Sequence, residues 1–339
     1  MKIYLCNDME QWIKQSGIGQ ATAQQKLALE LAQIPYTLTN KNEYDIIHLN
    51  TIFPQSYFKA KKAKQKGKAV IFHAHSTVED FKDSFFFANA LLPLFSWWLK
   101  KCYRTADLLL TPSNYSKALL ENYKLDTPIE VISNGIVLSD WQCSTEEEEF
   151  FRHKYQLKMN DPLIISVGLP IKRKGLLDFI EMAKQLPAYQ FIWFGYTNPN
   201  LLTKEIKEAL QSNLSNLQFP GYIPHDELRV AYQTCDVFLF LTHEETEGIV
   251  LLEALASKTN VIVRDIPIFR DEYIDGENIY KGSTLDDFVR ITSELLQKKR
   301  LSLVGPAYDT VKKKSIEQTG QKLKSYYQKL LHGYYHKNK

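Results

Sequence analysis

The sequence predicts an α/β protein with two doubly wound parallel-sheet domains. Short apolar runs alternate with helix-like stretches along the whole chain, and the alternation restarts near the middle. Helices cover both faces of a parallel sheet, so its strands appear as continuous apolar runs. The length agrees with this prediction, because 339 residues are enough for two domains of ordinary size.

The expected strands follow from the apolar runs. In the first half of the chain they cover residues 2–6, 45–49, 69–73, 107–111 and 129–132. In the second half they cover residues 162–167, 190–194, 236–241 and 260–263. A polar stretch at 141–151 separates the two series, and its four consecutive glutamates are typical of a linker or helix start rather than a metal site. We therefore expect a first domain over residues 1–140, a second over 141–305, and a basic helix over 306–339 that packs back on the first.

The composition is that of a globular protein from a reducing compartment. Hydrophobic residues make up 44% of the sequence and charged residues 24%. The four cysteines are scattered without a CxxC pair, which argues against a disulfide framework and against a zinc site. The N-terminus turns polar too early for a signal peptide, and the longest uncharged run, 84–99, is too short to span a bilayer. We expect a cytoplasmic protein.

Aromatic side chains and lysines gather in the first domain. The net charge is +3, but the first and last segments of the chain are basic and the middle is acidic. The stretch 81–104 is dense in Phe, Leu and Trp, and residues 59–68 are rich in lysine. Aromatics bordered by lysines are typical of a surface that dips into an anionic membrane, although core packing and a solvated helix would also account for them. No nucleic-acid-binding module is recognisable, so we expect no nucleic-acid partner.

Two carboxylates follow the apolar run 236–241. Glu245 and Glu253 are separated by seven residues, among them Gly248. The run predicts a buried strand, and the residues after Gly248 predict a helix. Glu245 would then lie in the loop at the carboxyl end of the strand, and Glu253 near the helix start. Small phosphorylated ligands bind at this edge of an open α/β sheet.

A basic turn after the expected strand 162–167 is a second candidate site. It contains Lys172, Arg173 and Lys174 and opens a helix at Gly175. Cations beside a helix N-terminus would hold a diphosphate through both charge and dipole. The turn matches neither the Walker A motif nor GxGxxG, and a plain basic surface turn accounts for it equally well.

Near the start of the chain, Gly17 and Gly19 precede a predicted helix. Glycines at such a place let backbone N–H groups approach a ligand closely. Taken alone, this is a weak signal that an ordinary turn would also produce.

Two histidines close the expected strand 69–73. Side chains alternate along a strand, so His73 and His75 share a face. No clear third ligand lies nearby, and we therefore expect no metal. We expect His75 to hydrogen-bond a substrate hydroxyl or phosphate, and His73 to be structural.

Four motifs together resemble those of a retaining glycosyltransferase of family GT4, which has the GT-B fold. They are Glu245-x7-Glu253, Lys174-Gly175, Ser133–Ile136 and the early glycine loop. The resemblance implies two Rossmann-like domains that face a central cleft. More narrowly, a Gram-positive group that adds a second hexose to monoglucosyl-diacylglycerol is similar over His73–Phe81, Phe191–Thr197, Glu244–Ala256 and Val263–Pro267. Its product is a diglycosyl-diacylglycerol, a membrane lipid and lipoteichoic acid anchor.

The resemblance implies a role for each matching residue. Glu253 would bind the ribose hydroxyls of a UDP-sugar, Glu245 would contact the donor hexose, and Lys174 would neutralise the leaving diphosphate. Gly19 would let the backbone approach that diphosphate, and His75 matches a histidine near the donor sugar. Backbone N–H groups between the two glutamates would hold hexose and phosphate; they belong to Thr246, Glu247, Gly248 and Ile249.

Two positions depart from the family. Many relatives have arginine directly after the glycine of the phosphate loop, where this chain has Leu169, and Arg173 is the candidate to replace that charge. Glu247 stands where relatives often have phenylalanine. The resemblance implies retention of the anomeric configuration by same-face attack. Cations and helix dipoles can stabilise the leaving diphosphate, so we expect no cofactor, and Mg²⁺ is not indicated.

The preferred hypothesis is a hexosyltransferase that uses UDP-glucose or UDP-galactose, acts on a glycolipid, and binds peripherally to the inner face of the cell membrane. One alternative is a transferase of capsular or exopolysaccharide synthesis with a polyprenyl-linked acceptor. Another is a non-catalytic GT-B scaffold that binds membranes, against which the intact Lys174, Glu245 and Glu253 argue. The sequence leaves open the donor sugar, the linkage formed and the oligomeric state.

Overall fold

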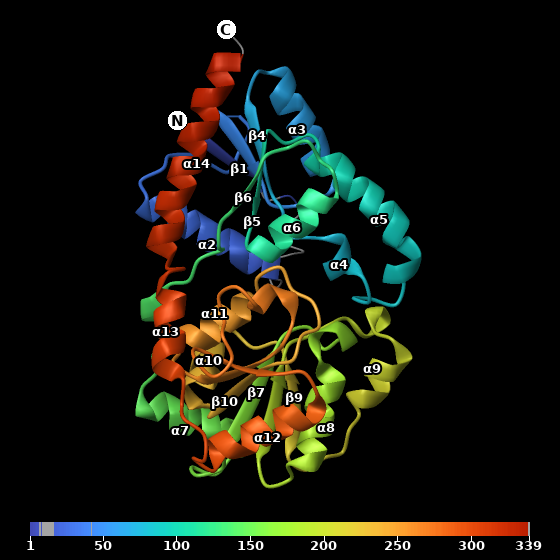
Figure 1. The fold of residues 1–339 in the computed structure, drawn as a ribbon, viewed down its shortest axis with the longest axis vertical. Coiled ribbons are helices and arrows are strands. Elements are labelled where there is room, and N and C mark those ends of the chain that lie inside the picture. The colour runs from blue at the N-terminus through green and yellow to red at the C-terminus, as the bar shows by residue number, and fades with distance from the viewer. Residues whose placement is uncertain (7, 9–16, 42, 338–339) are drawn as a thin grey trace. The chain divides into compact units, whose positions relative to one another are not determined.

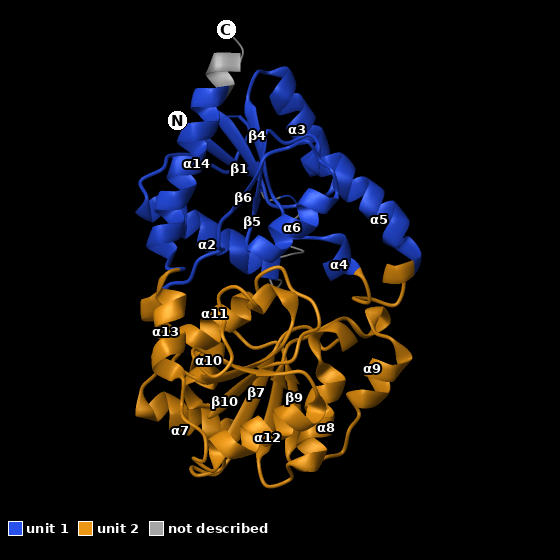
Figure 2. Cartoon of the chain, in the orientation of Figure 1, with its two compact units in different colours: residues 1–81, 90–137, 314–339 blue, residues 82–89, 138–313 orange. Residues whose placement is uncertain are grey.

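The structure is a computed structural model that describes residues 1–6, 8, 17–41 and 43–337 (Figure 1). The chain forms two compact units, shown in Figure 2. Unit 1 comprises Met1–Phe81, Ala90–Val137 and Lys314–Lys339, and unit 2 comprises Lys82–Asn89 and Leu138–Lys313. Each unit contains a six-stranded sheet in which the paired strands are parallel. The predicted fold class, two parallel-sheet α/β domains, is confirmed.

In unit 1 the sheet has the order β2-β1-β3-β4-β5-β6. Its strands are β1 (Ile3–Cys6), β2 (Tyr36–Thr37), β3 (Ile46–Leu49), β4 (Ala69–His73), β5 (Leu108–Thr111) and β6 (Ile129–Val131). Its helices are α2 (Gly17–Leu31), α3 (Pro54–Gln65), α4 (Val78–Phe81), α5 (Ala88–Tyr103), α6 (Asn114–Asn122) and α14 (Ile316–Lys337). Side chains along β4 alternate between two cores: Phe72 packs with residues of α3 and α5, and Ile71 with residues of α2 and α14. Helices therefore cover both faces of the sheet.

In unit 2 the sheet has the order β12-β11-β10-β7-β8-β9. Its strands are β7 (Leu163–Val167), β8 (Gln190–Phe194), β9 (Leu217–Gly221), β10 (Val237–Phe240), β11 (Asn260–Arg264) and β12 (Tyr280–Gly282). Its helices are α7 (Thr145–Lys154), α8 (Leu176–Gln185), α9 (Lys204–Ala209), α10 (His225–Thr234), α11 (Ile249–Ala256), α12 (Leu285–Leu296) and α13 (Val304–Lys312). Neighbouring residues of β8 show its two faces, since Trp193 packs on Phe179 of α8 and Phe194 packs on Phe151 of α7.

Three strands were not expected from the sequence, namely β2, β9 and β12. All three lie at an edge of their sheet. An edge strand has a neighbour on one side only and is less fully covered by helices, so its sequence need not be a continuous apolar run. In β9, for example, only Leu217 is fully buried. The apolar pattern thus identified the interior strands of each sheet and one edge strand, β6, and missed the other three edge strands.

The unit boundaries fall at other residues than 140 and 305. Residues 82–89 belong to unit 2, and the C-terminal segment consists of two helices, α13 in unit 2 and α14 in unit 1. α14 packs on α2, where a Cβ added to Gly320 would lie 2.4 Å from the Ala28 carbonyl oxygen. The hydroxyl of Tyr326 donates to the Val131 carbonyl oxygen at 3.0 Å. The last helix is therefore an integral part of unit 1.

Candidate functional site

The candidate site lies at the carboxyl ends of β7 and β10, which are neighbours in the sheet of unit 2. The loop after β7 passes through the 3-10 turn Lys172–Lys174 into α8, and the loop after β10 leads into α11. Parallel strands end at the same edge of a sheet, and ligands of open α/β sheets bind at that edge. The basic turn and the segment from Glu245 to Glu253 therefore lie on adjoining loops.

Lys174 and Glu245 form an ion pair between these two loops. Their side chains are only 16% and 7% exposed, so salt and solvent screen the pair weakly. Gly175 permits the contact, because its φ is 82° and a Cβ would lie 2.3 Å from the Leu241 carbonyl oxygen. The two residues of the Lys-Gly motif thus have complementary roles. Gly175 lets the loop lie against the end of β10, and Lys174 pairs with the Glu245 carboxylate.

The three cations of the basic turn have different surroundings. The side chain of Lys172 is 63% exposed and pairs with a surface glutamate. Arg173 is buried: its Nε donates to Ser84 Oγ at 3.0 Å, and its Nη1 donates to the Glu244 carbonyl oxygen at 2.8 Å. The structure thus directs Arg173, which the sequence connects with the diphosphate, to oxygens of two protein loops. Lys174 meets the carboxylate of Glu245, a residue of the candidate site.

Glu253 is enclosed within unit 2. The residue is 3% exposed, and the Tyr232 hydroxyl donates to Glu253 Oε2 at 3.0 Å. Burial raises the pKa of the Glu253 carboxyl from 4.5 to about 7, and the hydrogen bond from Tyr232 opposes this rise. The carboxyl is therefore close to half-ionised at neutral pH, and hydrogen-bond donors on a ligand would favour its charged form.

The segment between the two glutamates leads into α11. Gly248 is the N-cap residue, and Ile249 begins the helix. N–H groups in the first turn of a helix have no acceptor within that helix. Gly248 and Ile249 are therefore in a suitable place to present N–H groups to an anionic ligand, and Thr246 and Glu247 lie in the loop before the helix.

Two histidines predicted to share a face do stack in unit 1. The ring centroids of His73 and His75 are 4.2 Å apart, and those of His48 and His73 are 5.6 Å apart. His75 Nε2 lies 3.2 Å from Asn50 Oδ1, and Asn50 Nδ2 donates to Gln25 Oε1 at 2.7 Å. Burial lowers the pKa of His75 to about 4, so its ring is neutral at pH 7 and acts as a hydrogen-bonding group rather than as a cation.

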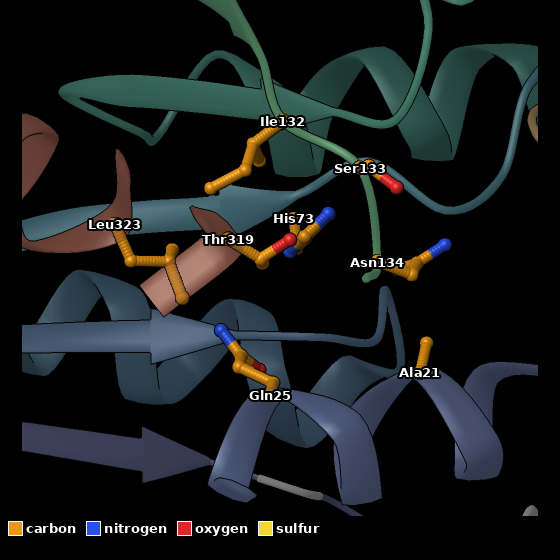
Figure 3. Close-up of a pocket in the computed structure, with 8 residues that line it drawn as sticks. All are labelled: Ala21, Gln25, His73, Ile132, Ser133, Asn134, Thr319 and Leu323. Carbon is orange, nitrogen blue, oxygen red and sulfur yellow. The ribbon is translucent and has the colours of Figure 1, made fainter. Parts of the chain in front are cut away.

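His73 lines a small cavity together with residues of α2, α14 and the chain after β6 (Figure 3). Within the described residues, neither of its ring nitrogens has a hydrogen-bond partner. Burial also lowers the pKa of His73 well below 6.5, so the ring is neutral and packs between its neighbours. The described part of the chain contains no group of three or more His, Cys, Asp or Glu placed to hold a metal ion.

The early glycine pair lies within a helix rather than before one. α2 begins at Gly17, so Gly19 is in its first turn, and Ser16 lies outside the described residues. The Thr22 hydroxyl donates to the Ile18 carbonyl oxygen at 2.8 Å and supports this early start. Gly19 and His75 belong to unit 1, and the other predicted site residues belong to unit 2.

Three residues that hydrogen-bond to predicted site residues were not singled out from the sequence: Asn50, Ser84 and Tyr232. The hydrogen bond between Tyr232 and Glu253 spans 21 positions of the chain, and that between Ser84 and Arg173 spans 89. No periodicity or spacing rule connects residues so far apart in the chain. Only the tertiary structure could identify these partners.

Two family models match the chain. "Glycosyl transferases group 1" matches residues 147–317, and "Glycosyltransferase Family 4" matches residues 24–140. The processive diacylglycerol alpha-glucosyltransferase of Acholeplasma laidlawii is 38% identical over 98% of this chain and 99% of that protein. The alpha-galactosylglucosyldiacylglycerol synthase of Streptococcus pneumoniae is 25% identical over 67% of this chain and 62% of that protein.

Solved structures share the fold. The crystal structure of Anabaena Alr3699/HepE in complex with UDP and glucose has a TM-score of 0.75 at 16% identity and covers 97% of this chain and 100% of that one. Sucrose-phosphate synthase from Thermosynechococcus elongatus has a TM-score of 0.72 at 20% identity and covers 86% of this chain and 74% of that one. Together with the two parallel sheets, these likenesses establish the GT-B fold. The chain therefore belongs to the group 1 glycosyl transferases of glycosyltransferase family 4.

Proposed function

We propose that this protein transfers a hexose from a UDP-sugar to monoglucosyl-diacylglycerol with retention of the anomeric configuration. The observation that carries this proposal is the match over nearly the full length to a relative named as a diacylglycerol alpha-glucosyltransferase. The name of the galactosylglucosyldiacylglycerol synthase supports an acceptor that already carries glucose. UDP-glucose and UDP-galactose are α-linked donors, so the α-products in both names correspond to retention.

In the proposed reaction, the bond between the anomeric carbon and the β-phosphate oxygen breaks as the acceptor hydroxyl attacks from the same face. Negative charge grows on the diphosphate, which takes up the proton of the acceptor hydroxyl as the new glycosidic bond forms. We assign Lys174 to this diphosphate, because it lies beside the start of α8 and its ammonium group already pairs with a carboxylate at the edge of the sheet. When the diphosphate takes the place of Glu245 at Lys174, the Glu245 carboxylate becomes available to hydroxyls of the hexose.

The remaining predicted site residues are assigned to the other groups of the UDP-sugar. We assign Glu253 to the ribose hydroxyls, and the N–H groups of residues 246–249 to hexose and phosphate. In unit 1 we assign the neutral ring of His75 to a hexose hydroxyl and the N–H region of Gly19 to the diphosphate. Negative charge on UDP is then met by Lys174 and by helix starts, and we expect transfer to proceed without a divalent metal.

A comparison of three lipid acceptors tests the proposed function. The purified full chain is given UDP-glucose or UDP-galactose with micelles that contain diacylglycerol, monoglucosyl-diacylglycerol or a polyprenyl-diphosphate sugar, with and without EDTA. We expect EDTA-resistant transfer to monoglucosyl-diacylglycerol, with mass spectrometry and NMR of the lipid product identifying the sugar and its linkage. Transfer to the polyprenyl acceptor alone would favour polysaccharide synthesis instead, and no transfer from either donor would refute both.

We also propose that a face of α5 docks on an anionic membrane. Leu91, Leu94 and Trp97 are 48%, 61% and 56% exposed, and their spacing places them on one stripe of the helix. Lys101 extends the stripe by one turn, with its Nζ 4.7 Å from the centre of the Trp97 ring. An apolar stripe that ends in lysine suits an interface with anionic lipid headgroups. No helix in the described part of the chain has the length and apolarity to cross a bilayer, and we propose peripheral attachment at the inner membrane face.

Trp97→Ala is expected to weaken binding to anionic vesicles by about tenfold, because half-burial of a large aromatic in lipid contributes of the order of 1–2 kcal/mol. Sedimentation with phosphatidylglycerol vesicles measures the partition coefficient. Phe150→Ala is the matched control: Phe150 is 71% exposed but lies on α7 beside Glu146–Glu149, so its removal should leave the coefficient unchanged. Equal losses in both variants would contradict a docking face on α5.

A further inference from the structure

Residues 82–89 run from the end of α4 into the first turn of α5 and form a closed loop that belongs to unit 2 (Figure 2). The Asp83 N–H donates to Asn89 Oδ1 at 3.1 Å, and Asn89 Nδ2 donates to Asp83 Oδ1 at 2.7 Å. The Phe86 N–H donates to the Leu201 carbonyl oxygen at 3.4 Å. The ends of the loop are thus joined to each other, and its middle is attached to unit 2.

Arg173 joins this loop to the candidate donor site. Its guanidinium donates from Nε to Ser84 Oγ at 3.0 Å and from Nη1 to the Glu244 carbonyl oxygen at 2.8 Å. The Glu244 carbonyl also accepts from Thr242 Oγ1 at 3.0 Å, and the His243 N–H donates to the Arg173 carbonyl oxygen at 2.8 Å. Ser84 is 5% exposed, so the bridge between the loops is shielded from water.

Arg173 and Lys174 together hold two consecutive residues of the loop after β10. Arg173 binds Glu244 through its carbonyl oxygen, and Lys174 binds Glu245 through its carboxylate. A guanidinium presents its donors in one rigid plane and can bridge two separate acceptors, which a single ammonium group does less well. The position of the 82–89 loop is therefore mechanically linked to the residue assigned to the donor hexose.

The same loop exposes two aromatic side chains, next to the exposed polar residues Lys82, Asp83 and Asn89. Phe86 and Phe87 are 63% and 61% exposed, and their ring centroids are 4.6 Å apart. The chain continues from them directly into α5, whose exposed stripe begins at Leu91. The loop thus carries two aromatic side chains suited to lipid on its exposed side and the contact to Arg173 on its buried side.

We propose that Arg173 is a positioning residue through which membrane docking of Phe86 and Phe87 and binding of the UDP-sugar favour each other. Insertion of the two aromatics in lipid restrains the 82–89 loop, and Arg173 transmits this restraint to the backbone at Glu244 and Glu245. Arg173 acts through these loops rather than as a ligand of the diphosphate. The inference rests on the proposed function, since it needs both the UDP-sugar and the lipid surface.

Calorimetry with UDP tests the coupling. The dissociation constant of UDP is measured for the full chain with and without phosphatidylglycerol vesicles that contain no acceptor. Vesicles should tighten UDP binding by about fivefold or more, and by reciprocity saturating UDP should tighten vesicle binding by the same factor. Ser84→Ala should bring this factor close to one, while the UDP affinity without vesicles stays within about twofold. Ser302→Ala removes a hydrogen-bonded hydroxyl elsewhere in unit 2 and should keep the full factor.

Arg173→Lys separates the two roles of this residue. Lysine keeps the positive charge. If residue 173 binds the diphosphate, this variant should keep both the UDP affinity and the tightening of UDP binding by vesicles. If residue 173 instead bridges the two loops, the variant should lose the tightening by vesicles. A factor of one in the unaltered protein, or an unchanged factor in Ser84→Ala, would overturn the inference. If sugar transfer and vesicle binding persist in that case, the proposed function stands and only the coupling fails; if transfer itself is absent, the proposed function fails.

Discussion

Lys174→Ala is expected to lower kcat for sugar transfer by about 100- to 1,000-fold, the usual effect of removing one group that stabilises developing negative charge. The side chain of Lys174 is only 16% exposed, and its pairing with Glu245 shows that its ammonium group reaches an anion at the edge of the sheet. The negative charge on the departing UDP grows during the reaction, so the loss should fall mainly on kcat and less on KM. Steady-state release of UDP with monoglucosyl-diacylglycerol as acceptor measures both constants.

Lys172→Ala provides a matched control from the same turn. Its side chain is 63% exposed and pairs with Glu205, which is itself 54% exposed, at 3.4 Å. Removal of this surface pair should change kcat by less than about twofold and leave the folded state intact, because exposed ion pairs contribute little to stability. If Lys174→Ala retained more than a third of the activity while remaining folded, the assignment of Lys174 to the leaving group would be wrong.

Glu253→Gln is expected to weaken UDP binding by about 10- to 100-fold at pH 8, because hydrogen bonds to a charged acceptor are worth more than those to a neutral amide. The pKa of Glu253 is about 7, so the carboxylate fraction rises between pH 6 and pH 8. Ribose hydroxyls donate to the carboxylate and favour its ionised form. The UDP affinity of the unaltered protein should therefore increase with pH across this range, and that of Glu253→Gln should not.

The Glu253 carboxyl has the opposite effect on the free energy of unfolding, which it lowers as the pH rises. Its pKa rises from 4.5 to about 7 on folding, so between these values the folded protein keeps a proton that the unfolded chain has released. The contribution of the protonated carboxyl to the free energy of unfolding is complete below pH 4.5 and is lost as the pH rises to about 7. The midpoint temperature of thermal unfolding should therefore fall between pH 4.5 and about 7, and Glu253→Gln should remove the part of this fall that is due to Glu253.

Tyr232→Phe serves as a second variant for this prediction. The Tyr232 hydroxyl donates to Glu253 and lowers its pKa, so its loss should move the midpoint of the UDP-binding profile to higher pH. Glu205→Gln, at an exposed position, should leave the profile as it is. A UDP affinity that is constant from pH 6 to pH 8 in the unaltered protein would contradict the assignment of Glu253 to a pH-dependent contact.

The sequence could predict that the basic turn and the Glu245 segment lie close together, because both are short segments next to strand ends. Lys174 and Gly175 follow one apolar run, and Glu245 follows another, so parallel strands in neighbouring positions bring them to one edge of the sheet. The role of Arg173 could not be predicted in the same way. Charge and position made it a candidate phosphate ligand, and its hydrogen bonds to Glu244 and Ser84 join residues 71 and 89 positions away in the chain.

The sequence by itself determined the alternation of buried strands and helices, the two parallel sheets, and the set of cations and carboxylates at their ends, because each depends on local periodicity or on neighbours in the chain. The tertiary structure decided which edge strands complete the sheets, which cation faces Glu245, and that residues 82–89 belong to unit 2. It also decided the ionisation of Glu253 and His75, because desolvation depends on how completely distant segments enclose a group. The sequence specifies which residues are present and how they are spaced. The burial of a side chain and its hydrogen-bond or ion-pair partner arise only when segments far apart in sequence pack together.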